Sequence, residues 1–272
     1  MKVFISVDLE GISGVFAEEQ ITVGTVAHQT ACGYMRDDVD AVIEGCLAAG
    51  ATEIVVADGH GRNANLRFEG LPDSVTLVSG SPIPLSMMDG VSSDCAAAML
   101  IGYHARAGTQ AAVLDHTYTY DVSRVRVGDR EIGEIGLNAA VAGSFGVPVV
   151  LVSGDDKAAS EVSSLIPQAT CAVVKHGMLR TAARLLSPGA ARGRLRESAQ
   201  RALSAPSRPQ PLDLGDDPLR VTFVSTGTCD RACRCPGVNR ISAREVEIDG
   251  ADYLEEFHIF LACLALAEGA AR

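Results

Sequence analysis

Short apolar runs alternate along this chain with longer amphipathic segments, and this alternation restricts the fold more than any other feature of the sequence. The apolar runs predict strands near 2–8, 53–58, 74–79, 97–103, 111–118, 122–127, 147–153, 169–174, 219–225 and 244–248. The longer segments predict helices near 28–49, 134–146, 155–166, 188–204 and 252–268. Strands separated by helices of about ten residues or more are typical of a mainly parallel sheet with helices on both faces. The sequence therefore predicts an α/β fold with three layers, α/β/α.

Two segments interrupt this alternation. Residues 125–132 have the pattern of a β-hairpin that turns at residues 128–129, so we expect the sheet to be mixed or to carry a protruding hairpin. Residues 205–218 are rich in proline and polar side chains, which predicts a linker. We expect a first domain at 1–204, which would carry the functional site, and a smaller C-terminal αβ segment at 219–272 packed on it.

The charge balance excludes several classes of partner. The 272 residues include 34 Asp and Glu against 23 Lys and Arg, which gives a formal net charge of -11. An acidic chain has no general attraction for nucleic acid or for anionic membrane surfaces. The chain starts directly with a predicted strand and without the features of a secretory signal, so we expect a cytoplasmic protein.

One uncharged stretch, residues 135–154, is long enough to be tested as a membrane-spanning helix. Pro148 and several glycines interrupt it, and its pattern changes from small residues to a Val-rich run. We therefore expect a buried helix followed by a buried strand, and no membrane partner.

The eight cysteines fit a reducing compartment, because most of them stand alone in apolar surroundings. Cys229, Cys233 and Cys235 form a cluster. Their spacing lacks the second pair or the nearby histidine of a typical zinc site. We interpret them as free thiols of a surface loop rather than as ligands of a structural zinc ion.

Side chains that bind metals stand where three of the predicted strands end. Asp8 and Glu10 close the first apolar run, His60 follows the run at 54–58, and His104 closes a third run. An i, i+2 pair on an extended segment points to one face, so the two carboxylates should converge. In open α/β sheets ligands bind beyond the carboxyl ends of the strands, where these four side chains would meet.

Glu134 begins the helix after the hairpin and becomes a fifth candidate ligand if that helix end faces the strand ends. Two imidazoles and three carboxylates suit a pair of divalent ions, most naturally zinc. The short side chain of Asp8 makes it the expected bridge between the two ions. Such a centre lowers the pKa of bound water towards about 7 and polarises a carbonyl or phosphoryl oxygen.

Each of these residues also has an ordinary structural interpretation when taken alone. A strand-end Asp or Glu often caps a helix or turn. A Glu in the first turn of a helix, such as Glu134, often does no more than interact favourably with the helix dipole. His60 alone could be a loop residue and His104 a hydrogen-bonded core histidine. The metal site is favoured because four metal-binding side chains follow successive strand ends.

Two further residues have less specific patterns. His116 lies near the end of the predicted strand at 111–118 and could act as a general acid or base near metal-bound water; a structural histidine fits its spacing equally well. Arg106 could bind a substrate carboxylate, although a surface ion pair is the favoured interpretation.

Five motifs give the sequence a family resemblance. They are SVDLEGISG at 6–14, DGH at 58–60, GYHARA at 102–107, GEIGLNA at 133–139 and VSGDDK at 152–157. In this order they resemble the D-aminopeptidase family of dipeptide-transport operons. The resemblance implies a dinuclear zinc aminopeptidase whose catalytic histidine is His116 and whose metal ligands are Asp8, Glu10, His60, His104 and Glu134. It also implies a homo-oligomer, a ring-shaped decamer of two stacked pentamers whose inner channel admits only small peptides.

The expected function is therefore hydrolysis of short peptides at their N-terminal bond, with the preference between D- and L-residues open. A metal-dependent phosphoesterase is one alternative, but it needs cationic groups for phosphate and the chain has only three lysines. A non-catalytic peptide-binding protein is the other alternative. It would have no use for six metal-binding or acid–base residues.

Overall fold

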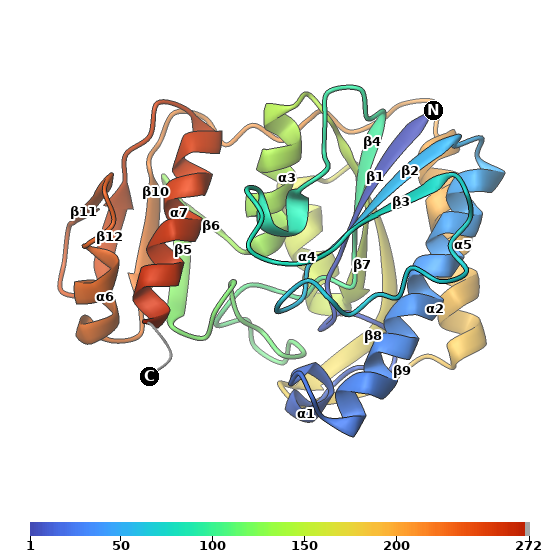
Figure 1. Cartoon of the computed structure of the whole chain (residues 1–272), viewed down its shortest axis with the longest axis horizontal. Helices are drawn as coiled ribbons and strands as arrows, with labels where there is room; N and C mark the ends of the chain where they lie inside the picture. Colours follow the sequence, from blue (N-terminus) through green and yellow to red (C-terminus); the bar gives the residue numbers. More distant parts are fainter. Residues whose placement is uncertain (270–272) are drawn as a thin grey trace.

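The computed structural model of the chain describes residues 1–269 and contains two β-sheets (Figure 1). The seven-stranded sheet has the order β3-β2-β1-β4-β7-β8-β9, and the five-stranded sheet has the order β11-β12-β10-β5-β6. The larger sheet consists of β1 (Lys2–Val7), β2 (Glu53–Asp58), β3 (Val75–Val78), β4 (Ala97–Ile101), β7 (Val149–Asp155), β8 (Thr170–Leu179) and β9 (Ala182–Leu185). The smaller sheet consists of β5 (Val122–Val127), β6 (Arg130–Ile132), β10 (Leu219–Phe223), β11 (Val238–Arg240) and β12 (Glu245–Ile248).

Helices cover both faces of the larger sheet, which confirms the three predicted layers (Figure 1). On one face, α2 (Val26–Ala48) packs against α5 (Pro188–Ser204), and α3 (Glu134–Ser144) and α4 (Asp156–Leu165) lie on the other. All strand pairs of this sheet are parallel except β8 with β9, so the sheet is mixed. The five predicted helices are all present.

Local sequence signals start several of these helices. The side chains of Thr25 and Asp155 accept hydrogen bonds from backbone N–H groups in the first turns of α2 and α4. Ser187 caps α5, whose first residue is Pro188. A cap of this kind stabilises a helix by about 1 kcal/mol, and proline is well suited to the first helical position.

The predicted hairpin is confirmed as β5 and β6, which turn at residues 128–129. Instead of standing alone, β5 pairs antiparallel with β10, with Val125 opposite Val221. The C-terminal part also contains α6 (Thr226–Ala232) and α7 (Tyr253–Glu268). The smaller sheet thus joins strands from before and after residues 205–218, and the division into domains stays a prediction.

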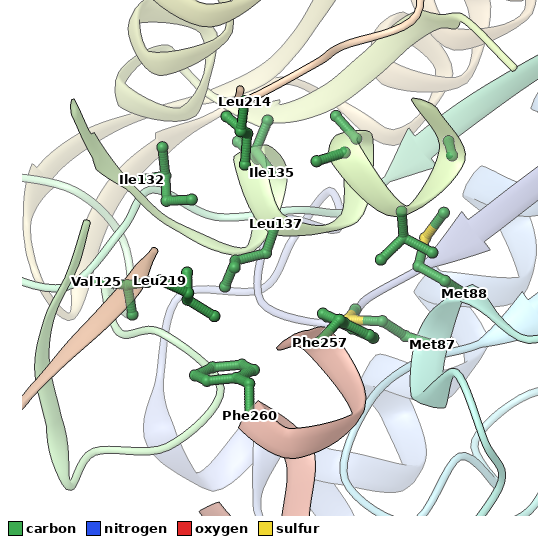
Figure 2. Close-up of a cluster of buried hydrophobic side chains, with 14 of the residues drawn as sticks. Met87, Met88, Val125, Ile132, Ile135, Leu137, Leu214, Leu219, Phe257 and Phe260 are labelled. Atoms are coloured by element: carbon green, nitrogen blue, oxygen red, sulfur yellow. The ribbon is translucent and has the colours of Figure 1, made fainter. Parts of the chain in front are cut away.

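Helix α3 is held between the two sheets by apolar side chains (Figure 2). Leu137 of α3 belongs to the same buried cluster as Phe257 and Phe260 of α7. The Tyr253 hydroxyl of α7 also donates to the backbone oxygen of Leu137 at 2.8 Å. These contacts with the C-terminal helix fix the position of the helix that begins at Glu134.

The predicted strand at 111–118 is wrong, because this segment is a loop between β4 and β5. Ala111, Leu114 and Tyr118 have φ angles of 58°, 52° and 59°. An L-residue in this left-handed conformation cannot continue an extended strand. The loop also carries His116, so the error bears directly on the functional site.

The predicted surface loop of thiols is also wrong. Cys229 is buried within α6, and Cys235 is buried in the turn after this helix, where its Sγ lies 3.9 Å from the backbone oxygen of Ile259. All eight cysteines are free. Residues 135–154 form most of α3 and β7, as predicted for a buried helix and strand. Within residues 1–269, no helix combines the length and the apolarity that crossing a membrane requires.

Candidate metal centre

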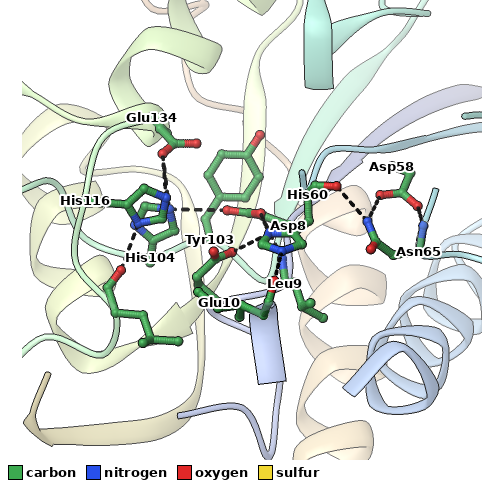
Figure 3. Close-up of polar contacts among 12 residues, drawn as sticks. Asp8, Leu9, Glu10, Asp58, His60, Asn65, Tyr103, His104, His116 and Glu134 are labelled. Carbon is green, nitrogen blue, oxygen red and sulfur yellow. Dashed lines mark hydrogen bonds and ion pairs between the residues drawn. The ribbon is translucent and has the colours of Figure 1, made fainter. Parts of the chain in front are cut away.

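The five predicted metal ligands lie together at one edge of the larger sheet (Figure 3). Asp8 and Glu10 follow β1, while His60 follows β2 and His104 follows β4. Because β1 is paired in parallel with both β2 and β4, the three strand ends meet at the same edge. Glu134 is the first residue of α3, and its carboxylate reaches the same place, next to His104.

Two glycines let the loops that carry these ligands approach closely. The N–H of Gly11 donates to the backbone oxygen of Gly102 at 2.7 Å. A Cβ at Gly11 would lie 2.0 Å from the backbone oxygen of Tyr103, which no side chain allows. Gly102 has a φ of 72°, a conformation that glycine adopts without strain. The close contact of the two loops brings Asp8 and His104 together.

Buried polar groups hold the loop that carries Glu10. Lys175 of β8 is fully buried, and its Nζ donates to three backbone oxygens of this loop, including that of Glu10 at 2.5 Å. Ser13 donates from its N–H and its hydroxyl to the buried carboxylate of Asp38 at 2.8 and 2.7 Å. The loop is therefore anchored to both β8 and α2.

The loop that carries His60 is held by Asp58 (Figure 3). The Asp58 carboxylate accepts hydrogen bonds from the backbone N–H groups of Asn65 and Leu66 and from the Asn65 side chain. The same side-chain amide donates to the backbone oxygen of His60 at 2.8 Å. Asp58 thus supports the loop without facing the centre.

Distances in the centre divide the ligands into two sets that share Asp8. His60 Nδ1 lies 3.1 Å from Glu10 Oε2 and 3.6 Å from Asp8 Oδ1. His104 Nε2 lies 3.3 Å from Asp8 Oδ2 and 3.2 Å from Glu134 Oε1. Each oxygen of Asp8 therefore faces a different imidazole, as expected of a bridging carboxylate.

All three imidazoles turn an unprotonated nitrogen toward the carboxylates when they are neutral. His60 Nε2 lies 2.8 Å from the backbone oxygen of Ile21, and His104 Nδ1 lies 3.0 Å from that of Ala105. His116 Nδ1 makes the same contact with a backbone oxygen at 2.9 Å. A carbonyl oxygen only accepts, so each of these nitrogens carries the proton. The second nitrogen is then free to bind a metal ion or a proton at the centre.

His116 lies beside the ligands. Its ring stacks on that of His104 with 4.1 Å between centroids and 9° between planes. Its Nε2 is 3.8 Å from Glu134 Oε1, so His116, His104 and Glu134 form one group whose ligand atoms lie within 4.8 Å of one another. Asp8, Glu10 and His104 form a second such group.

The electrostatic environment favours positive charge at this place. Burial lowers the pKa of His60, but the carboxylates of Glu10 and Asp8 outweigh it and raise that pKa to about 12. Burial also opposes charge on His104, yet Glu134 and Asp8 hold its pKa well above the usual range. For Asp8, burial raises the pKa, but the close imidazoles of His104 and His60 bring it well below its usual range.

The donor set fits divalent metal ions. The five candidate ligands are carboxylates and imidazoles, and an imidazole that gives up its second proton binds zinc as a neutral ligand. His104 Nε2 is buried and has no hydrogen-bond partner among residues 1–269. A buried polar atom without a partner is costly, and a metal ion at this position would satisfy it.

The centre lies in the wall of a cavity of about 670 Å³. Asp8, Glu10, His60, His116 and Glu134 line it. Other parts of its wall come from α1 (Glu18–Ile21), the short helix η1 (Ser86–Met88) and the loop after His116. A cavity of this size can hold a small ligand.

Arg106 lies outside this arrangement. Its guanidinium is 3.0 Å from the carboxylate of Glu131, and it does not line the cavity. This contact is the surface ion pair that the sequence analysis favoured, so a role in substrate binding stays untested.

Sequence reasoning missed two supporting residues. Lys175 lies one residue beyond the strand predicted at 169–174, whereas β8 continues to Leu179. A charged residue in an apolar strand was a usable signal, because a buried lysine needs acceptors. Tyr118, whose N–H donates to Glu134 Oε1 at 2.6 Å, gave no signal because its role depends on the loop backbone.

Comparisons with known proteins agree with this geometry. The Peptidase M55 family, described as D-aminopeptidase, matches residues 1–262. A D-aminopeptidase from Bacillus subtilis (strain 168) is 36% identical over 269 residues, which cover 98% of each chain. The structure of "Zn-dependent D-aminopeptidase DppA from Bacillus subtilis, a self-compartmentalizing protease" matches with a TM-score of 0.96 and 34% identity over 100% of both chains. The predicted fold class, family and peptidase activity are thereby confirmed, and this chain belongs to the D-aminopeptidase family.

Proposed function

We propose that this protein uses two zinc ions to remove the N-terminal residue from short peptides. In this proposal His60 and Glu10 hold one ion, His104 and Glu134 hold the other, and Asp8 gives one oxygen to each. The observation that carries the proposal is the common orientation of the imidazoles, which all turn an unprotonated nitrogen toward buried carboxylates. Zinc is supported by the zinc dependence of DppA, and the second ion by the division of the ligands into two sets.

Zinc ions held at this centre would polarise the scissile carbonyl group and activate a water molecule. His116 is the proposed acid–base residue. Because the backbone oxygen of Leu114 keeps the proton on Nδ1, Nε2 can accept a proton on the cavity side and pass it to the leaving amine. This use of His116 does not require it to bind metal, although its distance from Glu134 would allow that as well.

The charge of the cavity supports a substrate with a free amino group. Besides the ligands, Glu18, Asp121 and Glu268 line it, and no lysine or arginine does so within residues 1–269. An acidic wall attracts the ammonium group of a peptide and repels a phosphate group. The phosphoesterase alternative therefore lacks the cations that it needs.

We further propose that the chain forms a homo-oligomer, because DppA is described as self-compartmentalizing. The decamer of two pentamers and the acceptance of D-residues are expectations from the family resemblance, and the cytoplasmic location stays a prediction from the sequence. Sedimentation velocity would measure the number of subunits, and a single monomeric species would contradict the proposed assembly.

The central test uses Glu10→Ala and His104→Ala. Both variants should lose bound zinc together with hydrolysis of a dipeptide such as D-Ala-D-Ala, because each removes one ligand from a different set. Zinc content is measured by plasma mass spectrometry, and L-Ala-L-Ala and a generic phosphoester are assayed beside the D-dipeptide.

Exposed residues of the same types provide matched controls. Glu69→Ala and His176→Ala should retain both zinc and activity, since neither residue lies at the centre. Peptidase activity at the wild-type level in metal-stripped protein would refute the proposal. Faster cleavage of the phosphoester than of either dipeptide would favour the alternative enzyme class.

A further inference from the structure

A chain of buried and partly buried hydrogen bonds connects residues around the metal centre. The Tyr118 hydroxyl donates to Asn138 Oδ1 at 2.9 Å, and Asn138 Nδ2 donates to the Tyr103 hydroxyl at 3.1 Å. The Tyr103 hydroxyl lies 2.7 Å from Ser6 Oγ, which donates in turn to the backbone oxygen of Met87 at 2.7 Å. Ser6 Oγ has one proton and gives it to Met87, so it accepts from the Tyr103 hydroxyl, and the direction of the whole chain is fixed.

Three members of this chain lie within four positions of a candidate ligand in the sequence. Ser6 precedes Asp8 by two residues on β1, and Tyr103 directly precedes His104. Asn138 lies one helical turn after Glu134 on α3, on the same face of the helix. The hydrogen bonds therefore connect the segments that carry the ligands.

Tyr118 also contacts a ligand directly. Its backbone N–H donates to Glu134 Oε1 at 2.6 Å, and this oxygen faces His104 Nε2 at 3.2 Å. The N–H points there because Tyr118 has a φ of 59°. For a residue other than glycine this conformation costs about 1 kcal/mol or more, so contacts of the side chain must maintain it.

The ring of Tyr118 supplies these contacts through the C-terminal helix. It packs edge-on against Phe260 and Phe257 of α7, with centroid distances of 5.3 and 6.3 Å. Figure 2 shows the two phenylalanines facing α3. Aromatic pairs at these distances contribute about 0.5–1.5 kcal/mol each, enough to offset the backbone strain.

We infer that Tyr118 is a positioning residue for Glu134. Its side chain, fixed by Asn138 and by α7, holds the left-handed backbone conformation that aims its N–H at Oε1. The orientation of the Glu134 carboxylate then depends on the C-terminal helix. This inference rests on the proposed function, because it takes Glu134 as a zinc ligand.

The test compares zinc affinity in wild-type protein, Tyr118→Ala and Tyr118→Phe, measured on the full chain by competition with a chromophoric chelator. Loss of a partner that orients a metal ligand typically weakens metal binding about 10- to 100-fold. Tyr118→Ala should lower the affinity for one of the two zinc ions to this extent and leave the affinity for the other unchanged. Tyr118→Phe keeps the ring contacts and loses only the bond to Asn138, so it should weaken the binding of the same ion measurably, but by less than Tyr118→Ala does.

Tyr253→Phe is the matched control. It also removes one hydroxyl from the interface of α3 and α7, the one that donates to Leu137, but it leaves the loop of Tyr118 intact. Both of its zinc affinities should equal those of the wild type. If Tyr118 had only a structural role, its substitution would lower the melting temperature of the metal-free protein but would not weaken the binding of one zinc ion more than that of the other.

The outcomes separate the two proposals. Wild-type protein that binds no zinc overturns the proposed function and this inference with it. Wild-type protein that binds two ions, with Tyr118→Phe unchanged in both affinities, overturns the inference alone. Equal weakening by Tyr253→Phe and Tyr118→Phe also overturns it, since the interface and not Tyr118 would then be responsible. If Tyr118→Ala does not fold, Tyr118→Phe decides the question.

Discussion

Asp38 should make the folded protein less stable as the pH rises from about 4 to 6.5, and Asp38→Asn should remove this loss. The side chain is 1% exposed and lies in α2 beneath the loop that carries Glu10. Burial raises its pKa from 3.8 to about 6, although the hydrogen bonds from Ser13 and the charge of Lys175 act in the opposite direction. An asparagine can keep both contacts with Ser13, because its oxygen accepts from the N–H and its NH₂ donates to the hydroxyl.

The sign and the size of the effect follow from the two pKa values. Between them the folded protein holds a proton that the unfolded chain has released, so the free energy of unfolding falls as the pH rises. A difference of roughly two pKa units corresponds to about 3 kcal/mol. The stabilising effect of the proton is complete below the unfolded pKa and is lost above about pH 6.

Urea unfolding of metal-free wild type and Asp38→Asn, followed by circular dichroism from about pH 4.5 to 7.5, measures this difference. Protein concentration must be fixed, because assembly stabilises the folded chain by mass action. The stability of Asp38→Asn relative to wild type should increase by about 2 kcal/mol across this range, because about 1 kcal/mol of the full effect is already lost at pH 4.5. A difference that stays constant, or that decreases as the pH rises, would refute the reasoning.

Two other substitutions test the geometry of the centre. Gly11→Ala should lower the zinc content, measured by mass spectrometry, because its Cβ would lie 2.0 Å from the backbone oxygen of Tyr103; Gly33→Ala, where nothing lies within 4 Å, is the control and should retain zinc. His116→Gln should retain both zinc ions and lower kcat for dipeptides by about 10²–10⁴ fold, as expected for loss of an acid–base residue. Loss of zinc from His116→Gln would instead make His116 a ligand.

The sequence predicted the parts of the site that depend on strand ends. Asp8 and Glu10 lie just beyond the end of β1 at Val7, and His60 and His104 lie just beyond the ends of β2 and β4, the parallel neighbours of β1. The position of a strand end is set by the local apolar pattern, and parallel pairing then brings such ends to one edge. The local apolar pattern and the parallel pairing of strands were therefore enough to predict these four ligands.

The loop at 105–121 could not be predicted in the same way, because distant residues determine its backbone. The N–H of Leu114 donates to the backbone oxygen of Arg180, and that of Val113 donates to the Asp155 carboxylate. These partners come from the turn between β8 and β9 and from the end of β7. The apolar letters of this segment fit a strand equally well, and only the tertiary partners impose the left-handed residues.

The strand ends, on one side, and the loop after His116 with α7, on the other, contribute differently to substrate selection. The strand ends fix four of the ligands, whereas the loop after His116 and the C-terminal helix supply walls of the cavity through Tyr120 and Glu268. Tyr120 is half exposed, lies 4.9 Å from the His116 ring between centroids, and its hydroxyl donates to Glu18 at 3.0 Å. Residues that only hold metal ions are constrained by coordination geometry, while residues of the wall can change in size and charge without disturbing it. The preference for one peptide over another should therefore depend on the loop and on α7, the two parts whose positions the local sequence does not determine.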